Sequence, residues 1–416
     1  MAYHPNPWMI LPFALWLALI ALVPHYFSQW WTRHYGKLAL LFAAATIGYY
    51  LFVLPAGASQ TVLRTAHDYF SFIVLIGSLY VVSGGIQITV QGEGGPWRNV
   101  CFLALGGLAA NVLGTTGASM LLIRPWLRLT ESRAASRHVV FFIFIVANIG
   151  GGLTPIGDPP LLLGFLKGVP FWWVLRHCWP AWLLSMGLLL GAFYVMDRRD
   201  YVRARGSATA ASGQRWRCDG WWNLVFLAVI VAAVFVSHPW FLREGLMLAA
   251  AAGSFLTTGK KIHEANQFNF GPILEVAVLF FGIFATMIPA LDWLQVHART
   301  ILGHSPSPAL VYWSSGGLSS VLDSAPAYLA FASALSGVFG GMASLSQNGS
   351  AYLAALSVAT VFFGAVTYVG NGPNLMVKAI AERQGIRLPT FPGYFFKWAV
   401  PILLPLLLIL RVIFVR

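Results

Sequence analysis

Charged residues are scarce in this sequence, and that scarcity excludes most classes of soluble protein. Of the 416 residues only 9% are charged and 13 are acidic, whereas 58% are hydrophobic. A soluble chain carries about 25% charged residues, so a soluble enzyme, a nucleic-acid binder and a disordered protein are all excluded. The net charge of +13 comes mostly from basic residues in short breaks between apolar runs, where such residues orient a membrane protein.

Cysteine patterns and nucleotide-binding motifs are also lacking. The three cysteines, Cys101, Cys178 and Cys218, follow no metal-ligand spacing and make no disulfide framework. The sequence contains no phosphate-binding loop, which argues against an ATP-driven pump, and no His-Glu-x-x-His motif. We therefore expect no enzymatic activity and no cofactor, only a transported or coupling ion.

Long apolar runs are what the sequence has in abundance. A bilayer core needs about 20 apolar residues per helix. Such runs occur near 8–27, 38–55, 69–90, 98–123, 138–166 and 171–196, and again near 220–237, 241–258, 272–294, 308–334, 351–381 and 394–414. The arginine-rich stretch 197–219 separates the two sets. The prediction is an all-α polytopic membrane protein with a first repeat at 1–196, a cytoplasmic linker at 197–219 and a second repeat at 220–416.

Two runs in each half are interrupted by helix-breaking sequence. Residues 98–123 carry GTTG at their centre, and 138–166 contain GGGLTPIGDPP, whose prolines and glycines must interrupt a helix. Irregular backbone at membrane depth is tolerated only inside protein or beside a water-filled cavity. We predict a re-entrant hairpin at about 98–123 and a broken helix at about 138–166, matched by a hairpin at about 308–334 and a broken helix at about 351–381.

The two halves share short motifs at a nearly constant spacing. TPIGDPPLL at 154–162 aligns with TYVGNGPNL at 367–375, and the glycine pair at 106–107 aligns with the pair at 316–317. The offsets, 210 to 213 residues, indicate an internal repeat. If the hairpins do not cross the membrane, each half crosses it five times, and an odd number of crossings inverts the second half relative to the first.

The distribution of positive charge favours this inverted topology. With the N-terminus outside, the inside segments are 28–37, 91–98, 124–137, 197–219, 258–271 and 382–393, and they hold 17 of the 26 Lys and Arg residues. Positive residues concentrate on the cytoplasmic side. We therefore expect a multi-pass protein of the bacterial inner membrane with both termini in the periplasm.

Broken helices at matching positions of two inverted halves are typical of a transporter binding site. Hydroxyl and amide side chains gather at these breaks: Asn111, Thr115, Thr116, Thr154, Ser324, Thr367, Asn371 and Asn374. Their oxygens suit a hard cation such as Na⁺, and their donors would also suit a carboxylate. Small residues also allow close helix packing, but packing alone does not require the Pro-Pro and Asn-Gly-Pro breaks.

Two carboxylates stand inside apolar segments at the breaks. Asp158 and Asp323 are functional candidates because an ionisable group at that depth is costly, and we predict that they bind Na⁺ or a proton. The alternative is that each merely caps a half-helix. Glu275 and Asp68 are further candidates, as proton carriers, although both stand near the start of an apolar run, where an interfacial position is expected.

Other functional classes fit less well. An intramembrane aspartyl protease also needs two membrane carboxylates, but Pro155-Ile156-Gly157-Asp158 lacks one glycine of the G-x-G-D pattern, and an inverted repeat has no purpose in such an enzyme. A membrane scaffold without transport leaves the breaks unexplained.

The motifs NVLGTTGASMLLIR (111–124), NIGGGLTPIGDPPLLL (148–163), SSVLDSAPAY (319–328) and TYVGNGPNL (367–375) resemble those of the ion transporter superfamily. This superfamily includes NhaD-type sodium/proton antiporters, ArsB-type arsenite permeases, citrate permeases and INDY-type dicarboxylate transporters. The chain looks most like the bacterial branch of sodium:proton antiporters and citrate transporters. The resemblance implies two five-helix repeats, each with a re-entrant hairpin, and an elevator-like movement.

The hairpin tips decide which function the resemblance favours. Dicarboxylate transporters carry Ser-Asn-Thr motifs there, whereas these tips read Gly-Thr-Thr-Gly at 114–117 and Asp-Ser-Ala-Pro at 323–326. We therefore expect a secondary Na⁺/H⁺ antiporter. The alternatives are a carboxylate (citrate-like) transporter coupled to H⁺ or Na⁺ and, third, an arsenite or other anion permease. The expected partners are a small inorganic ion or carboxylate, the lipid bilayer and a second copy of the chain in a homodimer; nucleic acid is excluded.

Overall fold

The computed structural model describes residues 4–415 except 56, 92–93, 131–135, 205–214, 237, 240 and 304–305. Within these residues, seven helices are long and apolar enough to cross a membrane, or eight if the bent pair α14–α15 is counted as one span. Every apolar run marked out by the sequence is helical over most of its length. The chain is therefore a polytopic membrane protein, as predicted.

The first half is a series of helices with one break at residues 146–158. It contains the 3-10 helix η1 (Pro7–Ile10), α1 (Leu11–Tyr26), α2 (Ser28–Phe52), α3 (Ala58–Gly84), α4 (Pro96–Leu129), α5 (Ser136–Ile145), the 3-10 helix η3 (Ile149–Gly151), α6 (Pro159–Leu166) and α7 (Trp173–Ala204). The broken helix expected near 138–166 is thus α5, η3 and α6.

The second half contains more short helices. They are α8 (Asn223–Ala233), α9 (Leu242–Thr257), α10 (Lys260–Ala265), α11 (Gly271–Val296), α12 (Ala298–Leu302), α13 (Pro308–Val321), α14 (Ser324–Phe339), α15 (Met342–Asn348), α16 (Ser350–Phe363), α17 (Gly372–Arg383), α18 (Phe391–Tyr394), the π-helix η4 (Phe395–Leu403) and α19 (Leu404–Phe414). The break expected near 351–381 separates α16 from α17. The break within 308–334 separates α13 from α14, and these two helices contact each other.

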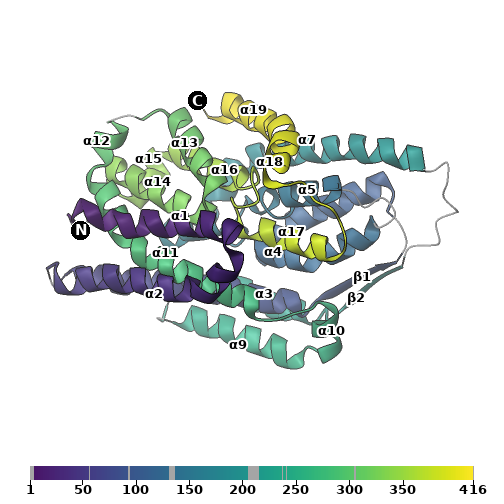
Figure 1. Cartoon of the computed structure of the whole chain (residues 1–416), viewed down its shortest axis with the longest axis horizontal. Coiled ribbons are helices and arrows are strands. Elements are labelled where there is room, and N and C mark those ends of the chain that lie inside the picture. The colour runs from purple at the N-terminus through teal and green to yellow at the C-terminus, as the bar shows by residue number, and fades with distance from the viewer. Residues whose placement is uncertain are drawn as a thin grey trace.

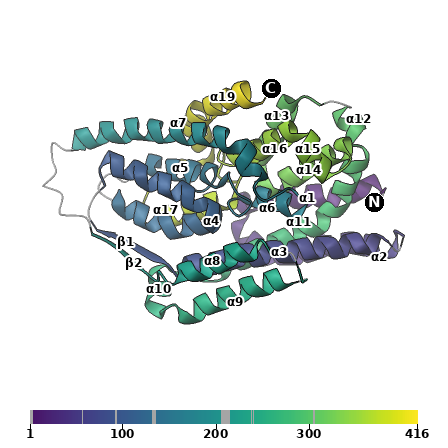
Figure 2. The same cartoon turned by 180° about the vertical axis from the view of Figure 1, so that it is seen from behind.

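Most of the helices lie roughly along the long axis of the molecule (Figure 1). In both views α2, α3 and α9 lie along one edge, and α7 and α19 lie along the opposite edge; Figure 2 shows α8 beside α3 and α9. Many large apolar side chains on the outer faces are exposed, among them Leu40, Leu41 and Phe52. In a helix bundle of this size, such exposure is expected where the surface faces lipid.

Helix α4 folds back on itself at Gly114, whose backbone has φ 72° and ψ 154°. The rings of Phe102 and Trp126 stack with their centroids 5.4 Å apart, although a continuous helix would place residues 24 positions apart about 36 Å from each other. At the base of the hairpin, the Gly94 amide donates to the Leu129 carbonyl at 3.0 Å. Helix α4 therefore consists of two packed arms whose outer ends lie side by side; that this hairpin is re-entrant stays a prediction.

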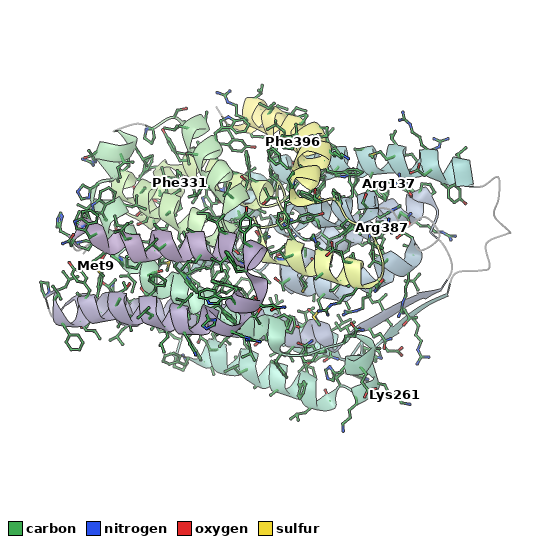
Figure 3. All side chains as sticks on the ribbon, in the orientation of Figure 1. Met9, Arg137, Lys261, Phe331, Arg387 and Phe396 are labelled. Atoms are coloured by element: carbon green, nitrogen blue, oxygen red, sulfur yellow. The ribbon has the colours of Figure 1, made fainter. Side chains whose placement is uncertain are left out.

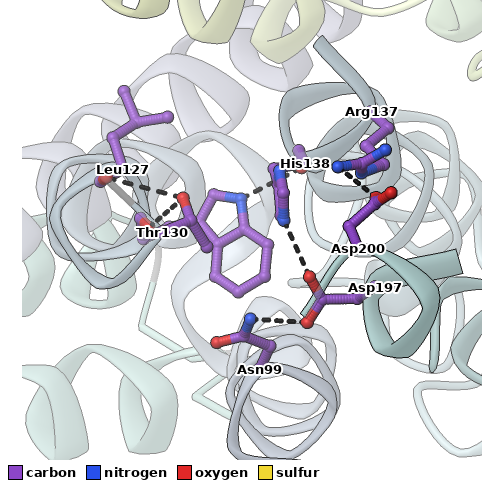
Figure 4. A network of polar contacts seen from close by, with 8 residues as sticks. Asn99, Leu127, Thr130, Arg137, His138, Asp197 and Asp200 are labelled. Atoms are coloured by element: carbon purple, nitrogen blue, oxygen red, sulfur yellow. Dashed lines mark hydrogen bonds and ion pairs between the residues drawn. The ribbon is translucent and has the colours of Figure 1, made fainter. Parts of the chain in front are cut away.

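A buried polar network fixes this base to two other helices (Figure 4). Asn99 of α4 donates to Asp197 Oδ2 at 2.8 Å, and His138 Nε2 of α5 lies 3.1 Å from Asp197 Oδ1. The His138 and Asp197 side chains are almost fully buried. Because Asp197 is on α7, the network ties α4, α5 and α7 together, and an ion pair joins Arg137 to Asp200 beside it.

One small sheet departs from the all-α prediction. Strand β1 (Gln87–Gln91) pairs antiparallel with β2 (Arg215–Asp219), with Gln87 opposite Asp219 and Gln91 opposite Arg215. Strand β2 lies within the expected linker 197–219. The first residues of that segment extend α7 to Ala204, and 205–214 lie outside the described residues. The ribbon therefore joins the segment before α4 to the segment before α8.

Three basic residues from different segments lie at the end of the molecule that holds this ribbon. Arg137, Lys261 and Arg387 all lie in that half, whereas Met9 and Phe331 lie in the other (Figure 3). They belong to three of the segments that the charge pattern assigned to the inside, 124–137, 258–271 and 382–393. We call this the basic end of the molecule.

Candidate functional site

Asp158 lies at the break between η3 and α6, where the backbone turns sharply. Gly157 packs directly on the Gly151 carbonyl, and a Cβ at Gly157 would collide with that oxygen. The chain bends back on itself and then enters α6 in an extended conformation, with φ −142° and ψ 142° at Asp158. The Asp158 carboxylate occupies the N-cap position without capping the helix, so it is available to groups on other elements.

The Asp158 carboxylate accepts two hydrogen bonds through a single oxygen. Thr115 Oγ1, just past the tip of the α4 hairpin, donates to Oδ1 at 2.8 Å, and Asn371 Nδ2, at the start of α17, donates to the same oxygen at 3.0 Å. The residue is only 1% exposed. Its second oxygen, Oδ2, has no hydrogen-bond partner among the described residues. A buried carboxylate with an unpaired oxygen is costly and calls for a proton or a cation.

A small cavity adjoins this carboxylate. It has a volume of about 20 Å³ and lies between α3, the hairpin tip and the start of α6; Thr115, Thr116 and Asp158 are among its lining residues. About 10–15 Å³ is enough to hold one water molecule. The cavity therefore accommodates one water or one bare monovalent cation. Thr116 lines this cavity, and no hydrogen bond between Thr116 and Asp158 is recorded among the described residues.

Three asparagines connect the two broken helices where they meet. Asn148 Nδ2 donates to Asn374 Oδ1 at 2.7 Å, and Asn371 Nδ2 lies 3.2 Å from Asn148 Oδ1. Asn374 in turn donates to the carbonyls of Gly364 and Thr367. All three asparagines are buried. The network fixes the Asn371 amide so that it faces Asp158.

Asn111 and Thr154 hold the first break against the hairpin. Asn111 Nδ2 donates to the Gly150 carbonyl at 2.6 Å, and Asn111 Oδ1 accepts from the Leu153 amide at 2.9 Å. Thr154 Oγ1 donates to the Asn111 carbonyl at 2.6 Å and accepts from the Gly157 amide. These two predicted site residues lie beside the site, but their polar atoms already pair with backbone, so their role here is positioning.

Corresponding contacts recur in the second half at nearly the same spacing. Thr367 Oγ1 donates to the Ser320 carbonyl at 2.6 Å and accepts from the Gly370 amide three residues on, as Thr154 does from Gly157. The Ser324 amide donates to the Gly370 carbonyl, and the Thr115 amide donates to the Gly157 carbonyl. Thus the local geometry of each hairpin tip against each break is repeated, with Thr367 in the positioning role of Thr154.

The two halves place their carboxylates on different elements. In the first half the break holds Asp158 and the tip holds Gly114; in the second the break holds Asn371 and the tip holds Asp323. Asp323 is partly buried and caps α14, where Oδ1 accepts from the Ala325 amide at 3.0 Å. The Asp323 carboxylate acts electrostatically on Asp158. Capping therefore describes Asp323 but not Asp158.

Ser324, the residue after Asp323, has a buried hydroxyl. Its Oγ has no hydrogen-bond partner among the described residues. The site therefore contains two unpaired buried oxygens, Asp158 Oδ2 and Ser324 Oγ, one beside each hairpin tip. No Lys, Arg or His side chain makes a recorded hydrogen bond or ion pair with Asp158, Asn371 or Asp323 among the described residues, so the local charge is negative.

Comparison with known proteins now assigns the chain to a family. Residues 3–415 match the model of a family described as "Putative citrate transport". The chain belongs to this family. Two mycobacterial proteins, from Mycobacterium bovis and Mycobacterium tuberculosis, are each 25% identical to it over 380 residues, which cover 84% of this chain and 86% of the relative. Both are named as uncharacterized transporters.

Membership of this transporter family covers both halves of the site, because the match runs through both hairpins and both breaks. It supports the predicted class of membrane transporter without selecting the NhaD-type or ArsB-type relatives. The ion and the coupling are not specified by the family description.

The two predicted proton carriers lie away from the Asp158 site in this transporter. Glu275 is exposed near the start of α11. Asp68 pairs with Lys167 at 2.7 Å. Asp68 precedes its apolar run but lies well inside its helix, since α3 begins at Ala58: the segment before Asp68 contains no proline or glycine and continues the helix.

Asn148 is the site residue that the sequence analysis did not select. It was visible as a polar residue in an apolar run next to three glycines. However, only its contacts with Asn371 and Asn374, more than 220 positions away, show that it connects the two halves.

Proposed function

We propose that this membrane transporter is a secondary Na⁺/H⁺ antiporter in which Asp158 binds the two cations alternately. The observation that supports this most directly is the unpaired Oδ2 of a fully buried carboxylate beside a cavity of about 20 Å³. Carboxylate, hydroxyl and amide oxygens are the ligands that hard cations prefer. Thr115 and Asn371 hold the other carboxylate oxygen and orient the group.

Exchange follows from the cost of moving a bare carboxylate through the membrane. A charged side chain at the bilayer centre costs several kcal/mol, so Asp158 crosses only when a proton or a cation neutralises it. The two ligands compete for the same oxygen, and the site therefore carries one or the other. Asp323, with the unpaired Ser324 hydroxyl beside it, supplies a second oxygen cluster at the other hairpin tip.

The size and charge of the site favour a small cation over a tricarboxylate. Pockets for organic ligands usually have volumes of about 300–1,000 Å³, far above the cavity beside Asp158. Two carboxylates without a recorded basic partner would also repel an anion. A carboxylate substrate would therefore require a different conformation and a bound cation.

We further propose that residues 1–196 and 220–416 form two inverted repeats and that the α4 hairpin is re-entrant. The repeated contacts at Thr154 and Thr367 support the repeat, and the joined ends of α4 support the hairpin. With the basic end inside, both termini face the periplasm of a bacterial inner membrane. The hairpins and broken helices then move together across the membrane in an elevator-like step. A homodimer would provide the static part of the protein relative to which they move.

Citrate-like carboxylate transport, coupled to H⁺ or Na⁺, is the second candidate function. It is favoured by one specific observation, the family match over residues 3–415. The start of α17 offers backbone amides and the Asn371 and Asn374 side chains, a combination that can bind a carboxylate. In this case Asp158 would bind only the coupling cation.

Flux measurements on the purified protein in proteoliposomes distinguish these functions. A sodium gradient should drive proton movement without citrate, and D158N, which keeps the shape but removes the charge, should reduce that movement to the level of empty liposomes. D323N should do so too if both carboxylates take part. Citrate uptake driven by Na⁺ or H⁺, without citrate-independent exchange, would replace the antiport proposal with the second function. Wild-type flux in both variants would reject Asp158 as the coupling site.

A further inference from the structure

Two helices that begin at the candidate site end together at the basic end. The second arm of α4 starts at Thr115, and α17 starts beside Asn371; the two helices pack against each other. Figure 1 shows α4 and α17 overlapping and ending on the same side as the β-ribbon. At 1.5 Å per residue, Arg124 lies about 14 Å from Thr115 along its helix. The second arm of α4 and the helix α17 therefore both run from the candidate cation site to a separate group of basic side chains.

Arg124 is partly buried within this group rather than extended into solvent. Its Nη2 has one long contact, 3.4 Å to Gln267 Oε1. Its Nη1 is buried and has no hydrogen-bond partner among the described residues. Tyr80, Met120 and Ile273 form a buried apolar cluster one turn before Arg124, with Met376 of α17 packed against it. Burying an unsatisfied guanidinium nitrogen is costly, and the unpaired nitrogen points to a missing acceptor.

Two further arginines lie close to Arg124. Arg128, one turn further along α4, and Arg383, at the end of α17, both repel it electrostatically. No carboxylate forms a recorded ion pair with any of the three arginines in the described part of the chain. Nearby on α17, Glu382 pairs with Lys378 instead. Three like charges gathered without a countercharge are unfavourable unless an anion joins them.

Membrane orientation alone does not account for this arrangement. Exposed positive residues at the inside ends of helices are expected, and Arg128 and Arg383, both exposed, fit that pattern. A residue that serves only this purpose extends its charged group into the headgroup region. Arg124 instead contacts Gln267 and keeps one nitrogen buried, with no hydrogen-bond partner for it among the described residues.

We propose that Arg124, Arg128 and Arg383 form an oxyanion site at the basic end, for a carboxylate or phosphate group. The planar guanidinium matches such a group through two parallel hydrogen bonds. This site is separate from Asp158 and opposite to it in charge, and it joins α4 to α17. Its occupant has two sources: a soluble carboxylate such as citrate, or the phosphate of an anionic lipid.

Binding measurements on the full-length protein in an uncharged detergent test this site. We expect citrate, titrated by isothermal calorimetry at constant ionic strength, or phosphatidylglycerol, added in mixed micelles against phosphatidylcholine, to bind the wild type. R124Q should weaken the binding at least tenfold. R124K should weaken it less, because lysine keeps the positive charge but cannot form the two parallel hydrogen bonds of the guanidinium group. The matched control is K261Q, which removes an exposed charge at the same end of the molecule.

The two probes separate the two sources. Citrate binding that is lost in R124Q assigns the site to a soluble anion, and a phosphatidylglycerol preference lost in R124Q assigns it to a lipid. D158N should still bind citrate or phosphatidylglycerol at the arginine site, so a failure of the antiport proposal would not affect the proposal of this site. If R124Q does not fold, R383Q provides the same test. Absence of binding by both probes, unchanged binding in the Arg variants, or an equal loss in K261Q would overturn the proposal.

Discussion

Asn371 donates a hydrogen bond to Asp158 across 213 positions of the chain, and the two residues hold matching places at the starts of α17 and α6. Their backbones are alike as well, with φ −152° and ψ 137° at Asn371 against −142° and 142° at Asp158. The corresponding positions of the two halves therefore meet each other, one as a neutral amide donor and the other as a carboxylate. Of these two residues, only Asp158 can carry a negative charge that attracts a cation.

Thr115→Val should weaken the apparent Na⁺ affinity about tenfold and leave the maximal flux nearly unchanged. The change removes the 2.8 Å hydrogen bond that orients the Asp158 carboxylate. A hydrogen bond to a charged group contributes about 1.5–3 kcal/mol, and about 1.4 kcal/mol corresponds to a factor of ten. Sodium-dependent flux in proteoliposomes measures both parameters. Thr115→Ser keeps the hydroxyl and should behave as the wild type. A Thr115→Ser variant as impaired as Thr115→Val would show that the hydroxyl group does not determine the Na⁺ affinity.

Gly157→Ala should lower the thermal midpoint of the purified protein, with a destabilisation of about 1–3 kcal/mol from overpacking. The added methyl group would collide with the Gly151 carbonyl, and backbone cannot move aside as a flexible side chain can. Gly187→Ala in α7 is the matched control because nothing lies within 4 Å of its Cβ position. That variant should be neutral or more stable by up to about 1 kcal/mol. Equal midpoints for the two variants would show that the tight turn before Asp158 is not present.

His138→Phe should destabilise the protein by about 1–3 kcal/mol, because it removes one of the hydrogen-bond partners of the buried Asp197 carboxylate. Arg137→Gln, which breaks the neighbouring pair with the partly exposed Asp200, should cost at most about 1 kcal/mol. Thermal unfolding in detergent measures the contrast. A His138 variant as stable as the Arg137 variant would mean that the network in Figure 4 does not hold the hairpin base.

Topology can be tested by cysteine labelling after replacement of Cys101, Cys178 and Cys218. Single cysteines at Arg128 and Arg198 should react with an impermeant reagent only from the cytoplasm, and one at Asn348 only from the periplasm. The reason is the gathering of basic residues at one end. Labelling of Arg128Cys and Arg198Cys from opposite sides would contradict the re-entrant hairpin.

The sequence predicted the parts of the fold that depend on local chemistry. Clusters of glycine and proline interrupt a helix, so the breaks near Gly114 and before Asp158 and Asn371 could be placed within a few residues. The recurring contacts at the two breaks were detectable because the same local motif, Thr-x-x-Gly, occurs at 154–157 and 367–370. The burial of Asp158 followed from its place inside an apolar segment.

What the sequence could not predict depends on contacts between distant segments. The role of Asn148 is set by partners in the other half, and His138 pairs with Asp197 across 59 positions. Asp323 and Asp158 are the same residue type and each precedes a helix, yet Asp323 caps its helix and Asp158 does not. The donors from distant segments, Thr115 and Asn371, distinguish Asp158 from Asp323.

The β1–β2 ribbon sets an upper limit on how far the hairpin can travel. Gln91 is the last residue of the ribbon, and Gly94 is already hydrogen-bonded to the end of the hairpin at Leu129, so three peptide links connect the two. A fully extended chain advances at most about 3.6 Å per residue, which gives about 11 Å. While both attachments hold, the distance between Gln91 and Gly94 must stay within that length when α4 moves relative to the ribbon, and lengthening this connection by glycines would allow a longer movement.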